Sequence, residues 1–261
     1  MLSNGRGNRI MPGKWSQYRF YARDARFRPY MPQTALLNQQ TLSSYLGRFG
    51  SVYVKPNLQH TGKGVMKAWR QNNRYHYVFV RGKVQSFETV QEMYRHMRRR
   101  FGSKPHIVQK TIDLAKVGGR RYDIRVMMLR GGTGAWTYCG MLAKVAGQGS
   151  IVTNVRRGGG YAITVDQALS RSLNLSTDQI QAMKSRLIRL SHAICSRFNS
   201  YKYTSQIGID FAMDSSGRLW IIEVNFDFPS HDLFALLKDK TFYWKIKRTV
   251  RAYRSRGKKR R

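Results

Sequence analysis

An α+β fold with antiparallel sheets is predicted by the alternation of strand hairpins and helices. Strand-like segments flank short turns in two places, residues 122–129 with 135–145 and residues 207–213 with 219–224. Such turns join antiparallel neighbours. Residues 176–198 carry apolar side chains at helical spacing between these hairpins. A doubly wound parallel fold, which alternates single strands with helices, is therefore disfavoured.

The other elements follow from hydrophobic period and turn chemistry. Residues 1–30 show no clear period and are predicted to form a basic arm, and residues 238–261 a basic, aromatic helix and tail. Between them we expect a helix over 34–49 closed by Gly50, strands over 51–55, 65–70 and 75–80, a short strand after Gly82, a helix over 86–100 and a strand over 106–110.

Size and composition indicate one domain or two closely packed subdomains. The chain has 261 residues, of which 41% are hydrophobic and 12% aromatic, so a disordered chain is excluded. No apolar run reaches the roughly 18 residues of a membrane span, and no secretory signal is evident. Cys139 and Cys195 are too few for a disulfide framework. We therefore expect a cytoplasmic protein.

The charge balance is strongly basic. Lys and Arg number 48 against 13 Asp and Glu, giving a formal net charge of +35, and basic residues crowd both ends of the chain. Such a field attracts polyanions with a strong salt dependence, whether nucleic acid, anionic polymer or acidic protein. Charge alone does not choose among them, because a basic run is more often a solvated face or tail.

The late hairpin carries a candidate metal site. Glu223 and Asn225 are two residues apart in one strand, so their side chains leave the same face, and Asp210 lies on the partner strand. Two carboxylates and an amide oxygen suit magnesium that is also held by phosphates. The alternative is a polar sheet face. An unpaired carboxylate in so apolar a strand is costly, which favours the metal.

Two further segments suggest phosphate chemistry. Lys55 ends a strand just before a loop containing Gly62, Lys63 and Gly64. A strand-end ammonium reaches phosphate oxygens, and glycines let backbone N–H groups approach them. The loop lacks a Walker A pattern, and a plain hairpin turn explains it as well.

The strand containing Asp123 and Arg125 is the second segment, because both side chains share one face and Lys144 lies on the partner strand. Such cations are often surface decoration. Beside a metal site they would neutralise charge on a transferring phosphoryl group.

Taken in order, the motifs resemble the ATP-grasp superfamily, and most closely its spore-coat-associated YheC/YheD-type branch. The likeness spans about residues 13–229. Its segments are Gly13-Lys-Trp15, Pro32-Gln-Thr34, Val54-Lys-Pro56, Gly62-Lys-Gly64, Gln109-Lys-Thr-Ile-Asp113, Arg121-Tyr-Asp-Ile-Arg-Val126, Ile151-Val-Thr-Asn154, Gly158-Gly159 and the spacing of Asp210, Glu223 and Asn225. The closing metal motif and the Asp-Ile-Arg strand are the most specific of these.

The resemblance implies two α+β subdomains whose antiparallel sheets clamp a nucleotide. The ATP-grasp domain would cover residues 31–237, with about 51–113 as the first nucleotide-binding subdomain and about 114–237 as the second, which holds the metal site. An earlier nucleotide-binding lysine, usual in the superfamily, has no evident counterpart in the sequence. Arg23, Arg26 and Arg28 are the candidates to replace it.

The resemblance also implies a role for each matched residue. Lys55 would contact the phosphates of ATP, and the loop with Gly62, Lys63 and Gly64 would cover them. Backbone groups around Gln109, Lys110 and Thr111 would contact adenine, Ile112 would line its pocket, and Asp113 would bind ribose. Arg125 and Lys144 would contact the γ-phosphate and acyl-phosphate region, with Asn154 nearby. One or two Mg²⁺ ions would be held by Asp210, Glu223 and Asn225.

The implied activity is that of an ATP-dependent carboxylate–amine ligase working through an acyl phosphate. The basic charge suggests that its acceptor is an acidic peptide, an acidic protein or an envelope polymer. The alternative is a non-catalytic spore-coat or polyanion-binding protein on an ATP-grasp scaffold, associated with the coat or envelope. A third reading is nucleic-acid binding, because Tyr and Trp interleave with Arg and Lys over residues 241–254; an amphipathic packing helix explains that pattern equally.

Overall fold

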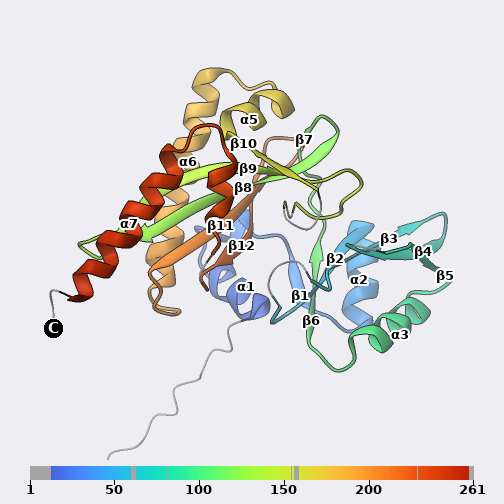
Figure 1. Cartoon of the computed structure of the whole chain (residues 1–261). Helices are drawn as coiled ribbons and strands as arrows, with labels where there is room; N and C mark the ends of the chain where they lie inside the picture. Colours follow the sequence, from blue (N-terminus) through green and yellow to red (C-terminus); the bar gives the residue numbers. More distant parts are fainter. Residues whose placement is uncertain are drawn as a thin grey trace, which may run out of the picture.

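Two antiparallel sheets, each with its own helices and core, form the protein (Figure 1). The structure is a computed structural model that describes residues 13–258 apart from 60–62, 81, 154, 156–158 and 228. The predicted α+β class with two antiparallel sheets is confirmed.

The first sheet has the strand order β1-β6-β2-β3-β4-β5. Helices α2 and α3 cover one face, where Leu42, Leu46, Met93 and Met97 pack on Val54 and its neighbours. The bounds are β1 Thr34–Leu36, α2 Gln39–Phe49, β2 Ser51–Pro56, β3 Met66–Gln71, β4 Arg74–Phe79, β5 Gln85–Phe87, α3 Val90–Phe101 and β6 His106–Lys110.

Both helices of the first sheet begin later than predicted, because side-chain caps fix their first turns. Asn38 accepts a hydrogen bond from the backbone of Thr41, which leaves the preceding residues free to pair with β6 as β1. Thr89 and Glu92 form a capping box at the start of α3. Residues 85–87 are therefore an edge strand and not helix.

The second sheet has the order β10-β9-β8-β11-β12, and β7 pairs with β8. The two predicted hairpins are confirmed as β8–β9 and β11–β12. The bounds are β7 Lys116–Val117, β8 Arg120–Arg130, β9 Trp136–Val145, β10 Tyr161–Ile163, β11 Gln206–Met213 and β12 Leu219–Asn225.

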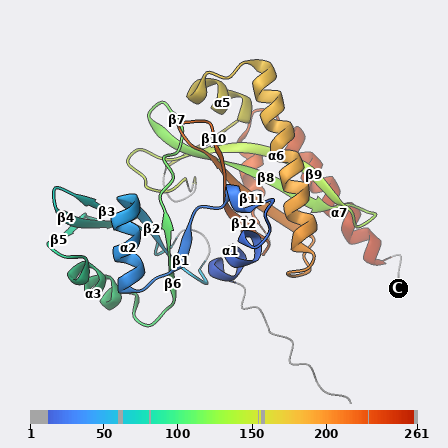
Figure 2. The same cartoon turned by 180° about the vertical axis from the view of Figure 1, so that it is seen from behind.

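Helices cover both faces of the second sheet (Figure 2). Alternate side chains of β8 define the faces: Ile124 and Val126 point to the core with α5 and α6, and Met127 and Leu129 to the core with α7. The helices are α1 Lys14–Ala22, α5 Val165–Leu173, α6 Thr177–Phe198 and α7 Thr241–Lys258, with 3-10 turns at Arg28–Tyr30 and Asp232–Leu236.

The predicted basic arm is packed structure from residue 13 onward. Helix α1 lies against the second sheet, and Tyr21 and Phe27 are buried in its core. The sequence of this region shows no helical period of apolar residues because its short helix is held by aromatic side chains rather than by a regular apolar stripe. The predicted C-terminal helix is present as α7. None of the helices in the described part of the chain could cross a membrane.

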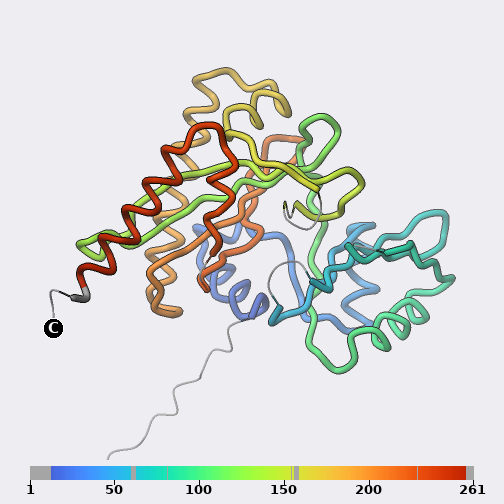
Figure 3. The backbone as a smooth tube through the Cα atoms, viewed as in Figure 1, coloured from blue at the N-terminus to red at the C-terminus, as the bar shows by residue number. Residues whose placement is uncertain are grey.

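The backbone passes between the two sheets twice (Figure 3). After α1 on the second sheet, the chain crosses to β1 of the first, and after β6 it crosses back. The return segment is fixed to the second sheet by Ala115, whose N–H donates to the carbonyl of Met213 at 2.9 Å. Residues 110–115 therefore lie where the two sheets meet.

Candidate functional site

Strand register places the predicted polar residues in a stepped row across the second sheet, with Lys144 and Asp123 two residues along β8 from Arg125, Asp210 and Glu223. Lys144 of β9 is opposite Asp123 of β8, Arg125 of β8 is opposite Asp210 of β11, and Asp210 is opposite Glu223 of β12. The period-2 geometry of strands turns these side chains to the same face. The placements inferred from the sequence for Asp123 with Arg125 and for Asp210 with Glu223 are confirmed by this register.

Asp210 is the centre of the row and is almost fully buried, with 5% of its surface exposed. Arg125 donates to both its oxygens, at 2.6 and 2.9 Å, Lys144 donates to Oδ1 at 2.9 Å, and the Asn225 amide donates to Oδ2 at 3.2 Å. Burial opposes ionisation, but Arg125 and Lys144 outweigh it and lower the pKa of Asp210. Asp210 is therefore an anion with each oxygen bonded twice.

Asp123 occupies the other side of Lys144. Its Oδ1 is 2.9 Å from the Lys144 ammonium, yet this buried oxygen has no hydrogen bond of good geometry within the described residues. Thr153 donates to its other oxygen. Burial raises the pKa of Asp123 to about 6, against the opposing charge of Lys144. Asp123 is thus the carboxylate of the row that ionises least readily.

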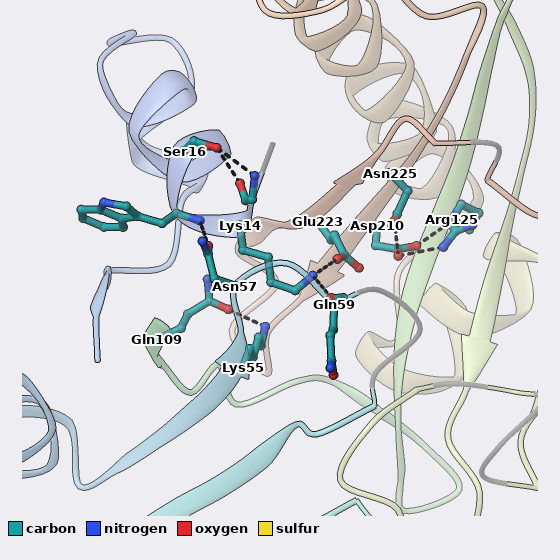
Figure 4. A network of polar contacts seen from close by, with 12 residues as sticks. Lys14, Ser16, Lys55, Asn57, Gln59, Gln109, Arg125, Asp210, Glu223 and Asn225 are labelled. Carbon is teal, nitrogen blue, oxygen red and sulfur yellow. Dashed lines mark hydrogen bonds and ion pairs between the residues drawn. The ribbon is translucent and has the colours of Figure 1, made fainter. Parts of the chain in front are cut away.

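Lys14 completes the row from outside the sheet (Figure 4). Its ammonium donates to Glu223 Oε1 at 2.6 Å and to the carbonyl of Gln59 at 3.0 Å. Burial alone would raise the pKa of Glu223, but the positive charge of Lys14 lowers it. The two side chains are 16% and 29% exposed, so the pair is largely desolvated.

A close backbone contact holds Lys14 in this position. Lys14 N–H donates to the Asn57 carbonyl, and Trp15 N–H donates to the Asn57 side chain, both at 2.9 Å. A Cβ at Gly13 would lie only 2.7 Å from the Asn57 amide nitrogen. Glycine at position 13 therefore allows the loop after β2 to clamp the first turn of α1.

Lys55 enters from the end of β2 on the first sheet. Its ammonium donates to Gln109 Oε1 at 2.6 Å, and Gln109 in turn donates to Thr34 Oγ1 at 2.9 Å. Burial lowers the pKa of Lys55 to about 8, and the charge of Glu223 partly opposes this shift. Lys55 is therefore close enough to the second sheet for the charge of Glu223 to affect its pKa. Among the described residues, it has no direct carboxylate partner.

The predicted glycine loop is described only in part. Gly62 lies outside the described residues, as does Asn154 of the later segment. Lys63 is exposed. Gly64 has φ +76°, a conformation that favours glycine, and it packs beside Pro56.

The segment expected to meet adenine has part of its backbone already paired. Lys110 N–H donates to the Gln33 carbonyl and Thr111 N–H to the Ser51 carbonyl. Those two donors are committed to the protein, and Gln109 and Lys110 also lie opposite Tyr53 and Val52 of β2 in the sheet.

The next two residues of this segment face the second sheet. Ile112 is buried with Ala212 and Trp220, and Asp113 accepts a hydrogen bond from the Ser215 hydroxyl at 2.9 Å. Both therefore lie at the junction of the two sheets, where the expected nucleotide pocket wall and ribose contact would be.

The donor set of the late hairpin suits magnesium chemically. Asp210, Glu223 and Asn225 bring two carboxylates and an amide together, and these are oxygen donors that Mg²⁺ prefers. In the described residues both carboxylates are paired with Lys or Arg, and no group of three or more His, Cys, Asp or Glu side chains is placed to hold a metal ion. A metal ion would therefore have to compete with Lys and Arg side chains of the protein for the oxygens of Asp210 and Glu223.

Lys14 and Thr153 are the site residues that the sequence did not single out. Their segments, Gly13-Lys-Trp15 and Ile151-Val-Thr-Asn154, were noted only for their likeness to other proteins. The arginines considered for an earlier lysine lie elsewhere: Arg26 pairs with Asp24, and Arg28 donates to the Ala22 carbonyl. From residue 13 onward, Lys14 is the basic residue before β1 that bonds Glu223.

Comparison with known proteins agrees with this architecture. A family model described as YheC/D-like ATP-grasp matches residues 7–255. The endospore coat-associated protein YheD of Bacillus subtilis (strain 168) is 22% identical over 252 residues, which cover 90% of this chain and 54% of that protein. The chain thus spans about half the length of this curated relative.

Among solved structures, D-alanyl-alanine synthetase A from Vibrio cholerae O1 biovar eltor aligns with a TM-score of 0.52 and 15% identity, covering 92% of this chain and 64% of that one. At this identity the similarity demonstrates the ATP-grasp fold. Since the family model extends over nearly the whole sequence, the chain belongs to the YheC/YheD-like ATP-grasp family.

Proposed function

We propose that the protein is an ATP-dependent carboxylate–amine ligase with its nucleotide held between the two sheets. The observation that carries this proposal is the meeting of four cations, Lys14, Lys55, Arg125 and Lys144, near Glu223 and the buried Asp210. Membership of the ATP-grasp family and the ligase among its structural neighbours support the same reading.

The proposed binding step is an exchange of charge partners. The phosphates of ATP compete with the carboxylates for Lys14, Arg125 and Lys144 and with the Gln109 side chain for Lys55, since all of these cations donate to oxygen acceptors. Release of the cations leaves Asp210 and Glu223 free, beside the Asn225 amide, to hold Mg²⁺. A bound magnesium ion would neutralise phosphate charge and polarise the phosphoryl group.

The proposed reaction then needs little covalent chemistry from the protein. A substrate carboxylate oxygen attacks the γ-phosphorus, ADP leaves, and an amine displaces phosphate from the resulting acyl phosphate. Arg125 and Lys144 would stabilise the charge on the transferring group. The acceptor in this proposal is an acidic peptide, an acidic protein or an envelope polymer.

Nucleotide binding and turnover are tested by calorimetric titration of Mg-ATP and by ADP release in the presence of carboxylate acceptors. Asp210→Asn and Glu223→Gln should abolish the magnesium-dependent part of binding and all turnover. Asp178→Asn, at an exposed position of α6, is the matched control and should leave both unchanged. Equal behaviour of all three variants would contradict the proposed site.

A second candidate is a non-catalytic coat or polyanion-binding protein that retains the ATP-grasp scaffold. Two observations favour it: every oxygen of Asp210 is already bonded within the protein, and the similar YheD protein is named as endospore coat-associated. Salt-sensitive attachment to coat or envelope material without ADP release would support this function. Turnover that depends on Asp210 would exclude it.

A further inference from the structure

Helix α7 presents a basic face whose Lys and Arg side chains form no ion pair with the residues that the structure describes. Lys247, Arg248, Arg251 and Arg254 are all exposed and recur at helical spacing, so they lie along one side of the helix. The opposite side packs on the second sheet through Ile246 and its neighbours. We call these four residues, with the exposed Trp244, the α7 face.

A pocket of about 610 Å³ adjoins the C-terminal part of this face. It is lined by Arg130, Arg254 and Arg256, together with Tyr203 and Tyr253, whose hydroxyl groups bond each other. Among the described residues, the acceptors of Arg130 are uncharged: the carbonyls of residues 134 and 204 and the side-chain oxygen of residue 199. Three guanidinium groups thus line one pocket without a carboxylate among the lining residues.

The absence of acidic residues makes this surface electrostatically one-sided. Residues 241–258 contain no Asp or Glu. In the described part of the chain, none of Arg130, Arg248, Arg251, Arg254 and Arg256 forms an ion pair. By contrast, Arg125 in the candidate nucleotide site is bonded to Asp210. The cations of α7 are therefore available to a polyanion.

Exposed aromatic rings indicate which kind of polyanion fits. Tyr203 is 68% exposed and Trp244 is 55% exposed, and they flank the basic stripe at its two ends. Exposed aromatic rings beside cations suit a single-stranded nucleic acid, because each base stacks on a ring while its phosphate meets a cation. Trp244 is one such ring, and the Tyr203 ring has the Arg130 guanidinium 5.2 Å from its centroid. An acidic polypeptide would pair with the cations, but its carboxylates would have no stacking interaction with the rings.

We propose that the α7 face and its adjoining pocket bind single-stranded nucleic acid. This site is separate from the candidate nucleotide site. Arg130 is five residues along β8 from Arg125, a separation of about 17 Å in an extended strand. Figure 1 places the C-terminal end of α7 beside the tip of the β8–β9 hairpin, away from the first sheet. The proposal does not depend on ATP binding.

The test measures fluorescence anisotropy of a labelled oligothymidylate of about 12 nucleotides with the full chain at several salt concentrations. The triple variant Arg248→Gln, Arg251→Gln, Arg254→Gln removes three cations of the α7 face while keeping helix propensity. Its slope of log affinity against log salt should be smaller in magnitude by about 2, since each phosphate contact on a single strand contributes about 0.7.

A matched control removes the same charge elsewhere. Arg95, Arg99 and Arg100 are exposed on α3 of the first sheet, and their replacement by Gln should leave the slope unchanged. Equal losses in the two triple variants would overturn the proposal, because binding would then follow net charge alone. Far-UV circular dichroism and thermal melts establish that both variants fold.

Trp244→Ala distinguishes nucleic acid from acidic polypeptide. Loss of one stacked base should weaken oligonucleotide binding by about fivefold or more and leave binding of polyglutamate unchanged. If polyglutamate binds as tightly as the oligonucleotide and Trp244→Ala changes neither, the surface accepts an acidic polypeptide and the nucleic-acid proposal is wrong. Because Trp244 is exposed, this variant tests the proposal even if the triple variant is unstable.

Discussion

The buried ammonium of Lys55 gives ATP binding a predicted dependence on pH. Its pKa is about 8 in the free protein because burial disfavours its charged form. A neutral Lys55 offers phosphate no charge, so only the protonated protein should bind ATP well. Between pH 7 and pH 9 the protonated fraction falls from about nine-tenths to about one-tenth, which weakens apparent ATP affinity about tenfold. Calorimetric titration of Mg-ATP at several pH values measures this change.

Lys55→Arg provides the control for that titration. A guanidinium stays charged throughout this range, so the variant should show a nearly flat profile between pH 7 and pH 9, whatever its absolute affinity. The difference between the two profiles isolates Lys55 from other groups that titrate there. A wild-type affinity that changes less than about twofold, or a variant profile that falls equally, would refute the assignment of Lys55 to the phosphates.

Three further predictions concern stability, measured by urea unfolding. Lys14→Met should lower the free energy of unfolding by about 1–3 kcal/mol, because it leaves the Glu223 carboxylate desolvated without its partner; adding Glu223→Gln should restore part of the loss, and no recovery would contradict the pairing. The raised pKa of Asp123 means that the folded state binds this proton more tightly than the unfolded state, so its contribution is present below pH 4 and lost as pH rises to about 6. Asp123→Asn should reduce the loss of unfolding free energy between pH 4 and pH 6 by up to about 3 kcal/mol. If the dependence of unfolding free energy on pH is unchanged in the variant, Asp123 ionises normally. Gly13→Ala should destabilise the protein by about 1–3 kcal/mol, since its Cβ would meet the Asn57 amide. In Gly47→Ala the added Cβ meets nothing within 4 Å, so this control should stabilise the protein. Equal effects of the two substitutions would contradict the contact that holds the first turn of α1.

The sequence predicted the elements whose signals are local. Two apolar segments joined by turn residues 214–217 predicted a hairpin, and that hairpin places Asp210 opposite Glu223. The two-residue spacing of Asp123 and Arg125 predicted a shared face in the same way. Helix starts were predicted less well, because the cap at Asn38 outweighed the apolar pattern before it.

The rest of the site depends on contacts that a local pattern does not encode. Lys14 and Glu223 are 209 residues apart, and their contact depends on the loop at Asn57 holding the first turn of α1. Period and spacing indicate which side chains of one strand share a face, as for Asp123 and Arg125, but not that Arg125 bonds Asp210 of another strand. The sequence therefore predicted the candidate ligands with Arg125 and Lys144 beside them, but it did not predict Lys14 or the ion pairs that these cations form with the carboxylates.

We propose that ATP and magnesium replace the internal ion pairs of this site. A crystal structure with a non-hydrolysable ATP analogue and Mg²⁺ tests it most directly. We expect the Lys14 ammonium to lie on the phosphates, and oxygens of Asp210 and Glu223 to coordinate the metal. Nucleotide bound elsewhere, or bound here with the Lys14–Glu223 and Arg125–Asp210 pairs intact and no metal on either carboxylate, would contradict it.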